Sequence, residues 1–246
     1  MKKGFVHTEN FKRLAEAQKL VQRRGAREAG LVIVQGRYGV GKSELCERWA
    51  VDNGAIFLRA QATWTKRSVI DGLADQLGVD KRGRNSEVQA RVIAKIAIGM
   101  TPMMFDEADF LVGTTGVLLE VVRDITDMTG TMCFMVGMER FGQKVARYEH
   151  IASRVNRVVE FQPLSLADVK ATCAALSEVE LEPAVVDVIH QQCKGVMRLV
   201  LGAIANIEQL AAANSLKRVT LEHVKNKTLV VEFNGKTLGR RTGDAQ

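Results

Sequence analysis

The sequence predicts an α/β fold in which helices flank a parallel sheet and a helical domain follows. Apolar segments typical of strands alternate with amphipathic segments typical of helices as far as residue 161. This alternation favours parallel strands that are joined by crossover helices. The strand pattern then stops at Pro163, and only helical periodicity continues. These observations divide the chain into an α/β part and a helical part.

Five short apolar segments are predicted as strands at 31–34, 55–58, 103–106, 131–137 and 155–161, and the first of them is largely β-branched. The segments between them have apolar residues at helical spacing. Before Pro163 we expect helices at 8–29, 44–50, 68–77, 87–98 and 117–126. After it we expect helices at 166–176, 183–192, 197–213 and 221–225.

A glycine-rich loop joins the first strand to its helix. It fits the pattern G-x-x-x-x-G-K-[ST] at every fixed position, with the residues Gly36, Arg37, Tyr38, Gly39, Val40, Gly41, Lys42 and Ser43. Glycines let backbone N–H groups turn inward around phosphates, and the helix N-terminus adds a favourable partial positive charge. We therefore expect ATP here, with Lys42 at its β- and γ-phosphates and the Ser43 hydroxyl holding Mg²⁺.

Two adjacent acids, Asp106 and Glu107, end the third strand. Paired acids are common in surface turns, but downstream of a phosphate loop they indicate the second half of a nucleotide-hydrolysing site. We expect Asp106 to hold Mg²⁺ and Glu107 to polarise the attacking water, while Asp109 begins a helix. The predicted domains are a nucleotide-binding α/β domain at 1–163, a helical lid at 164–228 and a basic, mobile tail at 229–246.

The composition is that of a soluble globular protein, with 46% hydrophobic and 26% charged residues in a chain of 246. No apolar run is long enough to span a bilayer, and no signal-peptide stretch follows the N-terminus. We therefore expect a cytoplasmic protein without a membrane partner. Reduced core thiols are expected at the four cysteines, which form no C-x-x-C pair: Cys46, Cys133, Cys173 and Cys193.

The net charge of +7 is unevenly distributed along the chain. Basic residues predominate in 1–30, 61–95 and 217–246, whereas 96–216 is acidic. This pattern suggests a polyanionic partner. Solvated surface charge explains the composition about as well.

The order of phosphate loop, Asp-Glu strand, further strand, arginine-bearing segment and helical lid resembles an AAA+ ATPase. Within that class the chain resembles the transposition ATPases of the phage Mu B, TniB and TnsC type. The resemblance covers most of residues 5–225. It lies in the segments 36–43, 62–65 ahead of 68–78, 105–109, 136–139, and 153–155 leading to 161–164.

The resemblance implies two functional arginines. Arg154 lies where the family has an arginine finger that reaches the ATP of the neighbouring subunit, and Arg147 and Arg157 are nearby alternatives. Arg198, in the segment 195–198, resembles the lid arginine that contacts the γ-phosphate of its own subunit. A surface arginine is the alternative interpretation of each.

The resemblance also bears on two other segments. After the fourth strand, Met138 stands where the family often has a polar residue that senses the γ-phosphate, and Glu139 is a possible substitute. The basic segment at 61–95 belongs to a part of the ATPase body that, in proteins of the resembled family, faces the DNA axis. The DNA contacts that we predict there are Lys66, Arg67, Lys81, Arg82 and Arg84.

The implied function is that of an ATP-dependent, sequence-nonspecific DNA-binding ATPase in the bacterial cytoplasm. ATP bound between subunits would drive assembly of a ring or helical filament on duplex DNA, where it marks the target for a transposase and stimulates it. One alternative is an AAA+ switch of another system, either a helicase loader or a secretion-linked ATPase resembling ExeA. Another is a nucleotide-binding scaffold with negligible turnover, against which the water-activating Glu107 argues.

Overall fold

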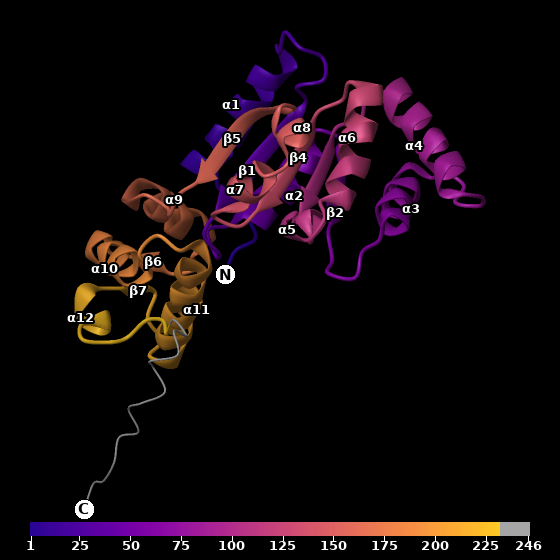
Figure 1. The fold of residues 1–246 in the computed structure, drawn as a ribbon. Coiled ribbons are helices and arrows are strands. Elements are labelled where there is room, and N and C mark those ends of the chain that lie inside the picture. The colour runs from indigo at the N-terminus through magenta and orange to yellow at the C-terminus, as the bar shows by residue number, and fades with distance from the viewer. Residues whose placement is uncertain (232–246) are drawn as a thin grey trace, which may run out of the picture. The chain divides into compact units, whose positions relative to one another are not determined.

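A computed structural model describes residues 1–231, and its larger sheet has five parallel strands (Figure 1). The chain divides into two compact units. Asn10–Gln162 contains the sheet and is called the sheet unit here. Met1–Glu9 and the residues from Pro163 onward form the second, which is called the helical unit. The predicted α/β fold with a parallel sheet and flanking helices is confirmed.

The sheet has the strand order β2-β3-β4-β1-β5, and all neighbouring strands are parallel. Leu31, which begins β1, lies opposite Cys133 of β4 and Val155 of β5. The carboxyl ends of the strands therefore share one edge of the sheet. The strands are β1 (Leu31–Gly36), β2 (Ile56–Arg59), β3 (Met103–Asp106), β4 (Cys133–Gly137) and β5 (Val155–Phe161).

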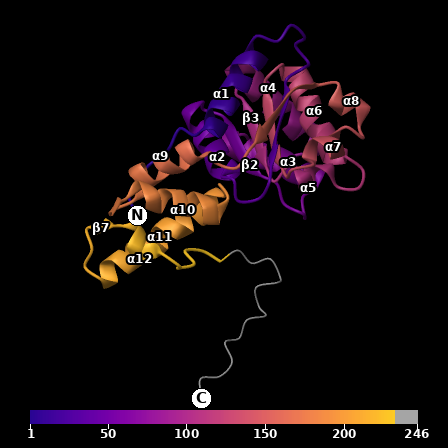
Figure 2. The ribbon, with the colours of Figure 1, turned by 90° about the vertical axis from the view of Figure 1, so that its left-hand side faces the viewer.

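One face of the sheet is covered by α1 (Glu9–Gln22) and α2 (Lys42–Asp52), on the left of the sheet in Figure 2. Trp49 of α2 packs against Phe134 of β4, with ring centroids 4.4 Å apart. The Trp49 indole Nε1 donates a 2.9 Å hydrogen bond to Gln18 of α1. This bond ties the two helices together and satisfies a polar atom inside the core.

The opposite face carries the remaining helices of the sheet unit. Their apolar side chains form one core with alternate strand residues such as Phe105 and Met135, as the twofold side-chain period of a strand requires. α3 and α4 pack against each other as a hairpin, and both contact α6. The helices are α3 (Lys66–Leu77), α4 (Asn85–Gly99), α5 (Asp109–Val112), α6 (Val117–Thr129), α7 (Phe141–Val145) and α8 (Glu149–Ala152).

The helical unit has its own core, which includes Ile189, Val200 and Ile204. It also contains two parallel two-residue strands, β6 (Glu180–Leu181) and β7 (Arg218–Val219). The expectation of helices alone after Pro163 is therefore wrong, because two residues are too short to display an alternating pattern. The helices are α9 (Leu166–Leu176), α10 (Pro183–Cys193), α11 (Met197–Ala213) and α12 (Leu221–Val224).

Both ends of the described chain attach to the helical unit. The Lys2 amide donates to the Leu176 carbonyl at 2.8 Å. At the other end Leu229 is buried, and its carbonyl accepts a 2.7 Å hydrogen bond from Asn206 Nδ2. Leu229 therefore packs in the core, although the sequence predicted it as the first residue of a mobile tail. Residues 232–246 of that predicted tail lie outside the described residues.

Two further expectations concern the whole described chain. All four cysteines are buried and free of disulfides, as predicted. Within residues 1–231, no helix combines the length and the apolarity that crossing a membrane requires.

Candidate active site

The phosphate loop depends on glycine at three positions. Gly39 and Gly41 have φ angles of 77° and 88°, in the left-handed region that a Cβ disfavours. At Gly36, an added Cβ would lie 2.6 Å from the Phe161 carbonyl oxygen of β5. The loop can therefore keep its shape and its position against β5 only with these residues.

Helix α2 begins inside the phosphate loop. Its N-cap, Gly41, provides no side-chain cap, so the first amides of the helix have no acceptor within the helix itself. Uncapped amides and the positive end of the helix dipole make a site for an anion. Lys42 and Ser43 are the first two residues of α2 and lie at this end.

The Lys42 ammonium lies at the mouth of the loop. Its Nζ donates to the carbonyls of Gly36 at 2.6 Å and Arg37 at 2.8 Å. Burial lowers the pKa of Lys42, and the nearby carboxylates of Glu107 and Asp106 act in the opposite direction. The lysine and the two acids predicted from separate segments are therefore electrostatic neighbours.

Asp106 ends β3 at the same edge of the sheet as the phosphate loop, and its side chain is 3% exposed. Its Oδ1 accepts a 3.0 Å hydrogen bond from the Glu107 amide. Its Oδ2 accepts a 3.0 Å hydrogen bond from Nε of Arg59 on β2. The sequence analysis did not find Arg59, because the residue becomes recognisable only when the register of β2 and β3 places it opposite Asp106.

Glu107 is the first residue after β3 and has a φ angle of 53°. A left-handed backbone is uncommon outside glycine, and such strain often marks functional positions. The conformation turns the chain out of the strand, and the side chain of Glu107 is exposed. The exposed Glu107 carboxylate can accept a proton from water. The buried Asp106 carboxylate keeps its position beside it.

The residues present fit ATP with Mg²⁺. The glycine cradle and uncapped α2 suit phosphate, and the Ser43 hydroxyl and buried Asp106 carboxylate are oxygen ligands of the kind that Mg²⁺ prefers. Among residues 1–231, no cluster of three or more His, Cys, Asp or Glu side chains could hold a metal ion. A cation held by few protein ligands, with substrate phosphates completing its shell, is the usual arrangement for Mg²⁺. When bound, the ion would neutralise charge on the phosphates.

Asp109 begins α5, as expected, and also organises the segment after β4. Its Oδ2 accepts a 2.7 Å hydrogen bond from the Met138 amide, and its Oδ1 pairs with Lys144 Nζ at 2.6 Å. Met138 carries a thioether and donates no hydrogen bond from its side chain. Glu139, the alternative sensor, is exposed. Lys144, which pairs with Asp109, was not found from sequence.

The structure does not bring Arg154 to the phosphate loop of its own chain. Arg154 precedes β5 and lies at the amino edge of the sheet, about 20 Å, or one strand length, from the loop. Its Nε donates to Asp127 Oδ2 at 3.2 Å and its Nη1 to Ser153 Oγ at 2.9 Å. Arg198 belongs to the other unit, where it is the second residue of α11 and is exposed.

Comparison with known proteins bears on this geometry. The model of one protein family, described as an AAA domain, matches residues 23–145. That range holds the phosphate loop, Asp106 and Glu107. A search of curated proteins finds no significant match.

Solved structures share the fold at low identity. The ORC2 protein of Aeropyrum pernix, in ADPNP–ADP complexes, gives a TM-score of 0.67 at 13% identity, over 88% of this chain and 66% of that chain. The ORC1 protein of Aeropyrum pernix in complex with DNA gives 0.61 at 21%, over 91% and 65%. The Thermotoga maritima RuvB Holliday junction branch migration motor gives 0.59 at 16%, over 89% and 68%. The chain spans just under two thirds of the length of the two Aeropyrum proteins.

The first prediction is that Lys42→Ala abolishes ATP binding, because Lys42 brings the positive charge into the loop. Calorimetry with ATP and Mg²⁺ measures the affinity. Arg48→Ala is a matched control, since it removes one positive charge from the exposed side of the same helix. Unchanged ATP affinity in Lys42→Ala would refute the site.

The second prediction separates binding from turnover. Glu107→Gln should retain ATP and Mg²⁺ but lose about 10²- to 10⁴-fold in hydrolysis rate, because an amide does not accept the proton of water. Phosphate release and ATP affinity are measured on the same preparation, with the exposed Glu47→Gln as the control. Hydrolysis at the parental rate would show that Glu107 is not the base.

Proposed function

Because the chain belongs to the AAA domain family, we propose that this ATPase assembles on duplex DNA when ATP binds between its subunits. Hydrolysis then releases the assembly. In this proposal the DNA-bound form marks a target for a transposase and stimulates it. The protein acts in the bacterial cytoplasm.

Within one subunit, we assign each residue of the site a role in binding or hydrolysis. Lys42 and the amides around it bind the phosphates, and Ser43 and Asp106 hold Mg²⁺. Glu107 accepts the proton of the attacking water. Arg59 keeps the Asp106 carboxylate in position. It donates to one carboxylate oxygen, while the Glu107 amide donates to the other.

One observation carries the assembly part of the proposal: Arg154 lies at the sheet edge opposite its own phosphate loop. A side chain of about 7 Å cannot cross a strand length of about 20 Å. If Arg154 acts on ATP, it therefore acts on the ATP of a neighbouring subunit, and the complete site forms only in the assembly. Arg198 is proposed as the arginine that contacts the γ-phosphate within the same subunit.

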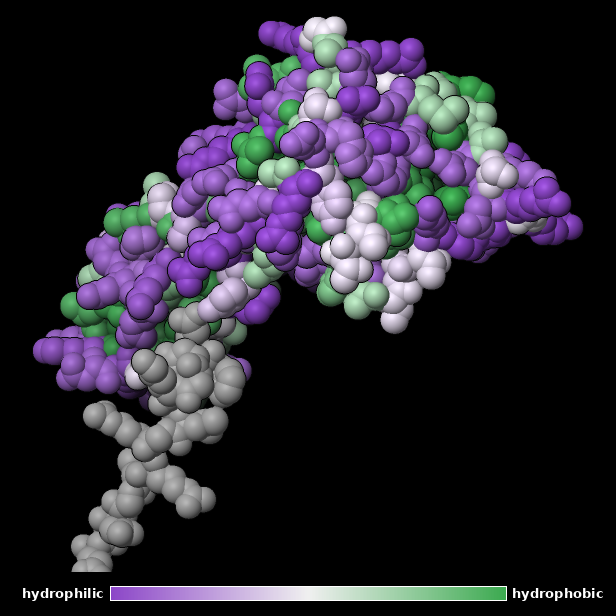
Figure 3. Space-filling model, viewed as in Figure 1, coloured by the Kyte–Doolittle hydropathy of each residue, from purple (hydrophilic) through white to green (hydrophobic). Residues whose placement is uncertain are grey.

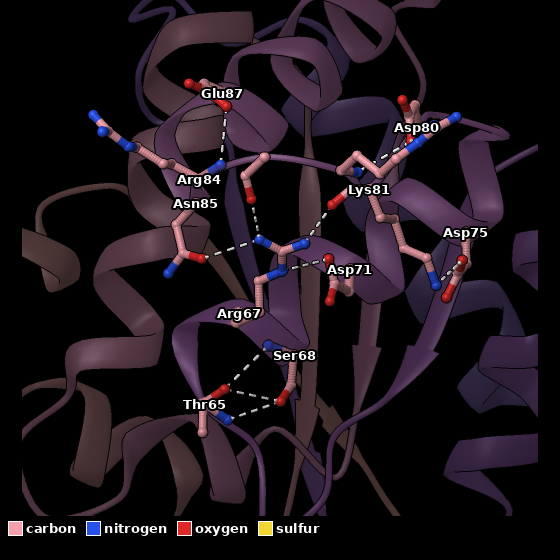
Figure 4. A network of polar contacts seen from close by, with 12 residues as sticks. Thr65, Arg67, Ser68, Asp71, Asp75, Asp80, Lys81, Arg84, Asn85 and Glu87 are labelled. Atoms are coloured by element: carbon pink, nitrogen blue, oxygen red, sulfur yellow. Dashed lines mark hydrogen bonds and ion pairs between the residues drawn. The ribbon is translucent and has the colours of Figure 1, made fainter.

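The DNA surface is proposed at the tip of the α3–α4 hairpin, which Figure 3 shows as strongly hydrophilic. The side chains of Lys81 and Arg82 are 45% and 92% exposed. Each pairs with an exposed acid, Asp75 or Asp80, and such surface pairs are weak enough to exchange for phosphate. Arg84 has no hydrogen bond or ion pair from its side chain to residues 1–231 and points away from its neighbours in Figure 4.

Support for DNA as the partner comes from three sources. The charge of the chain concentrates in basic segments, and the hairpin tip is one of them. A structural neighbour, the ORC1 protein of Aeropyrum pernix, was solved in complex with DNA. The sequence segments described above resemble transposition ATPases, and this resemblance is the reason for choosing a transposase as the further partner over a helicase loader or secretion system.

The third prediction tests the shared site. A trans-acting arginine is worth about 10³-fold or more in rate, so Arg154→Ala and Lys42→Ala should each be inactive alone. Mixing them should restore part of the ATPase activity, because some interfaces then pair an intact loop with an intact arginine. The ATPase rates of Arg147→Ala and Arg157→Ala, each measured alone, show whether one of these residues is the arginine finger in place of Arg154. Absence of rescue at every mixing ratio would mean that Arg154 acts in cis or not at all.

The fourth prediction tests the DNA surface. Changing Lys81, Arg82 and Arg84 together to Ala should weaken ATP-dependent DNA binding equally for all sequences. Each lost phosphate contact should lower the slope of log affinity against log salt concentration by about 0.9 per bound subunit. ATP binding without DNA should be unchanged. Parental affinity and slope in this triple variant would place the DNA surface elsewhere. The next candidates are Lys66 and Arg67, or Arg240 and Arg241, which lie outside the described residues.

A further inference from the structure

Two arginines bind four consecutive backbone carbonyls of the α3–α4 loop. Arg91 of α4 donates from Nε to the Asp80 carbonyl at 3.1 Å, and from Nη2 to the Arg82 carbonyl. Arg67 of α3 donates from Nη2 to the Lys81 carbonyl, and from Nη1 to the Gly83 carbonyl at 2.9 Å. The two guanidinium groups therefore alternate along the loop, and each holds two carbonyls.

The guanidinium of Arg67 is engaged at all three nitrogens (Figure 4). Besides the two carbonyls, Nε donates to Asp71 Oδ1 at 2.8 Å, which fixes the side chain on its own helix. Nη1 also lies 3.4 Å from Asn85 Oδ1, at the start of α4. The sequence analysis predicted Arg67 as a DNA contact, but here each of its three nitrogens donates to a protein acceptor.

The far end of the loop is fixed by Glu87. Its Oε2 accepts a 2.9 Å hydrogen bond from the Arg84 amide. Gly83 has a φ angle of 107°, and a Cβ there would lie 2.2 Å from the same Oε2. Near the other end, the Arg82 amide donates to Asp80 Oδ1 at 3.0 Å. The backbone from 80 to 84 is therefore held at both ends and along its length.

This arrangement determines what the loop presents to solvent. Four carbonyl oxygens, the negative ends of their peptide dipoles, are turned toward the guanidinium groups and screened by them. The side chains of Lys81, Arg82 and Arg84 remain outside. The outer surface therefore carries three cationic side chains, two of them paired with the exposed Asp75 and Asp80, and these four backbone oxygens are held away from an approaching phosphate.

We propose that Arg67 and Arg91 are positioning residues, which hold the loop in its phosphate-binding shape before DNA arrives and do not contact DNA. The inference rests on the proposed DNA-binding function. A loop ordered in advance loses less conformational entropy on binding, so its three cations bind more tightly than the same cations on a free loop.

The chemistry of arginine explains why these two positions are not lysines. A guanidinium presents five N–H donors in a planar fork, so it can hold two carbonyls and a carboxylate in fixed directions. An ammonium has the same charge but no such fork. Arg67→Lys and Arg91→Lys therefore preserve net charge while removing the geometry, which separates positioning from charge.

The test compares Arg67→Lys and Arg91→Lys with Lys95→Ala in the full chain. Lys95 is an exposed cation one turn beyond Arg91, and its loss changes charge without touching the loop. Amide hydrogen exchange is measured without DNA at Arg82 and Arg84, whose amides donate hydrogen bonds within the loop, and affinity for duplex DNA with ATP is measured at several salt concentrations. Each lysine variant should exchange about tenfold faster in the loop, the equivalent of one lost hydrogen bond, and bind DNA more weakly. Lys95→Ala should leave the exchange unchanged.

Combination with the Lys81, Arg82 and Arg84 triple Ala variant separates the possible outcomes. Adding Arg67→Ala to the triple variant should cause no further loss of DNA affinity. A further loss with a slope lower by about 0.9 would make Arg67 a phosphate contact and overturn the inference. Parental exchange in both lysine variants would also overturn it. If the triple variant alone binds DNA like the parent, the proposed DNA surface at the hairpin tip is wrong, while the exchange data still decide whether the arginines order the loop.

Discussion

The parallel register of β1, β3 and β4 is the constraint on which the site depends. Val34 lies opposite Val136, and Phe105 lies opposite Met135. Asp106 therefore ends its strand level with Val34, two residues before β1 ends at Gly36. The two strands are separated only by β4, which puts their axes roughly 10 Å apart. A shift of one residue in β3 would turn Asp106 to the opposite face of the sheet. Fold and chemistry are therefore fixed by the same hydrogen bonds.

The same sheet separates functions that belong to different subunits in the proposed assembly. Its carboxyl edge holds the phosphate loop and the two acids, and its amino edge holds Arg154. If Arg154 acts as proposed, nucleotide binding is coupled to subunit contact, because an arginine at the far edge can reach ATP only across an interface. At the hairpin tip, Arg67 and Arg91 hold the backbone of the α3–α4 loop. In our proposal this order is present before DNA binds.

The sequence alone located those residues of the candidate site that are adjacent along the chain. The phosphate loop and the pair Asp106 and Glu107 are linear motifs, and the strands around them are long enough to show their pattern. Arg59 was missed because its meaning depends on strand register. Arg67 looked like a surface cation because its acceptors are carbonyls 14 and 16 residues away, which side-chain patterns do not reveal. The short α5, α7, β6 and β7 give no periodic signal.

The central claim is that ATP couples the phosphate loop to assembly on DNA, and electron microscopy of the full chain tests it most directly. The protein is imaged with duplex DNA and Mg²⁺, in the presence and in the absence of ATP. The account predicts regular rings or filaments along the DNA with ATP, and separate molecules without it. Regular DNA-bound assemblies that form equally well without nucleotide, or no assemblies with ATP, would contradict the account.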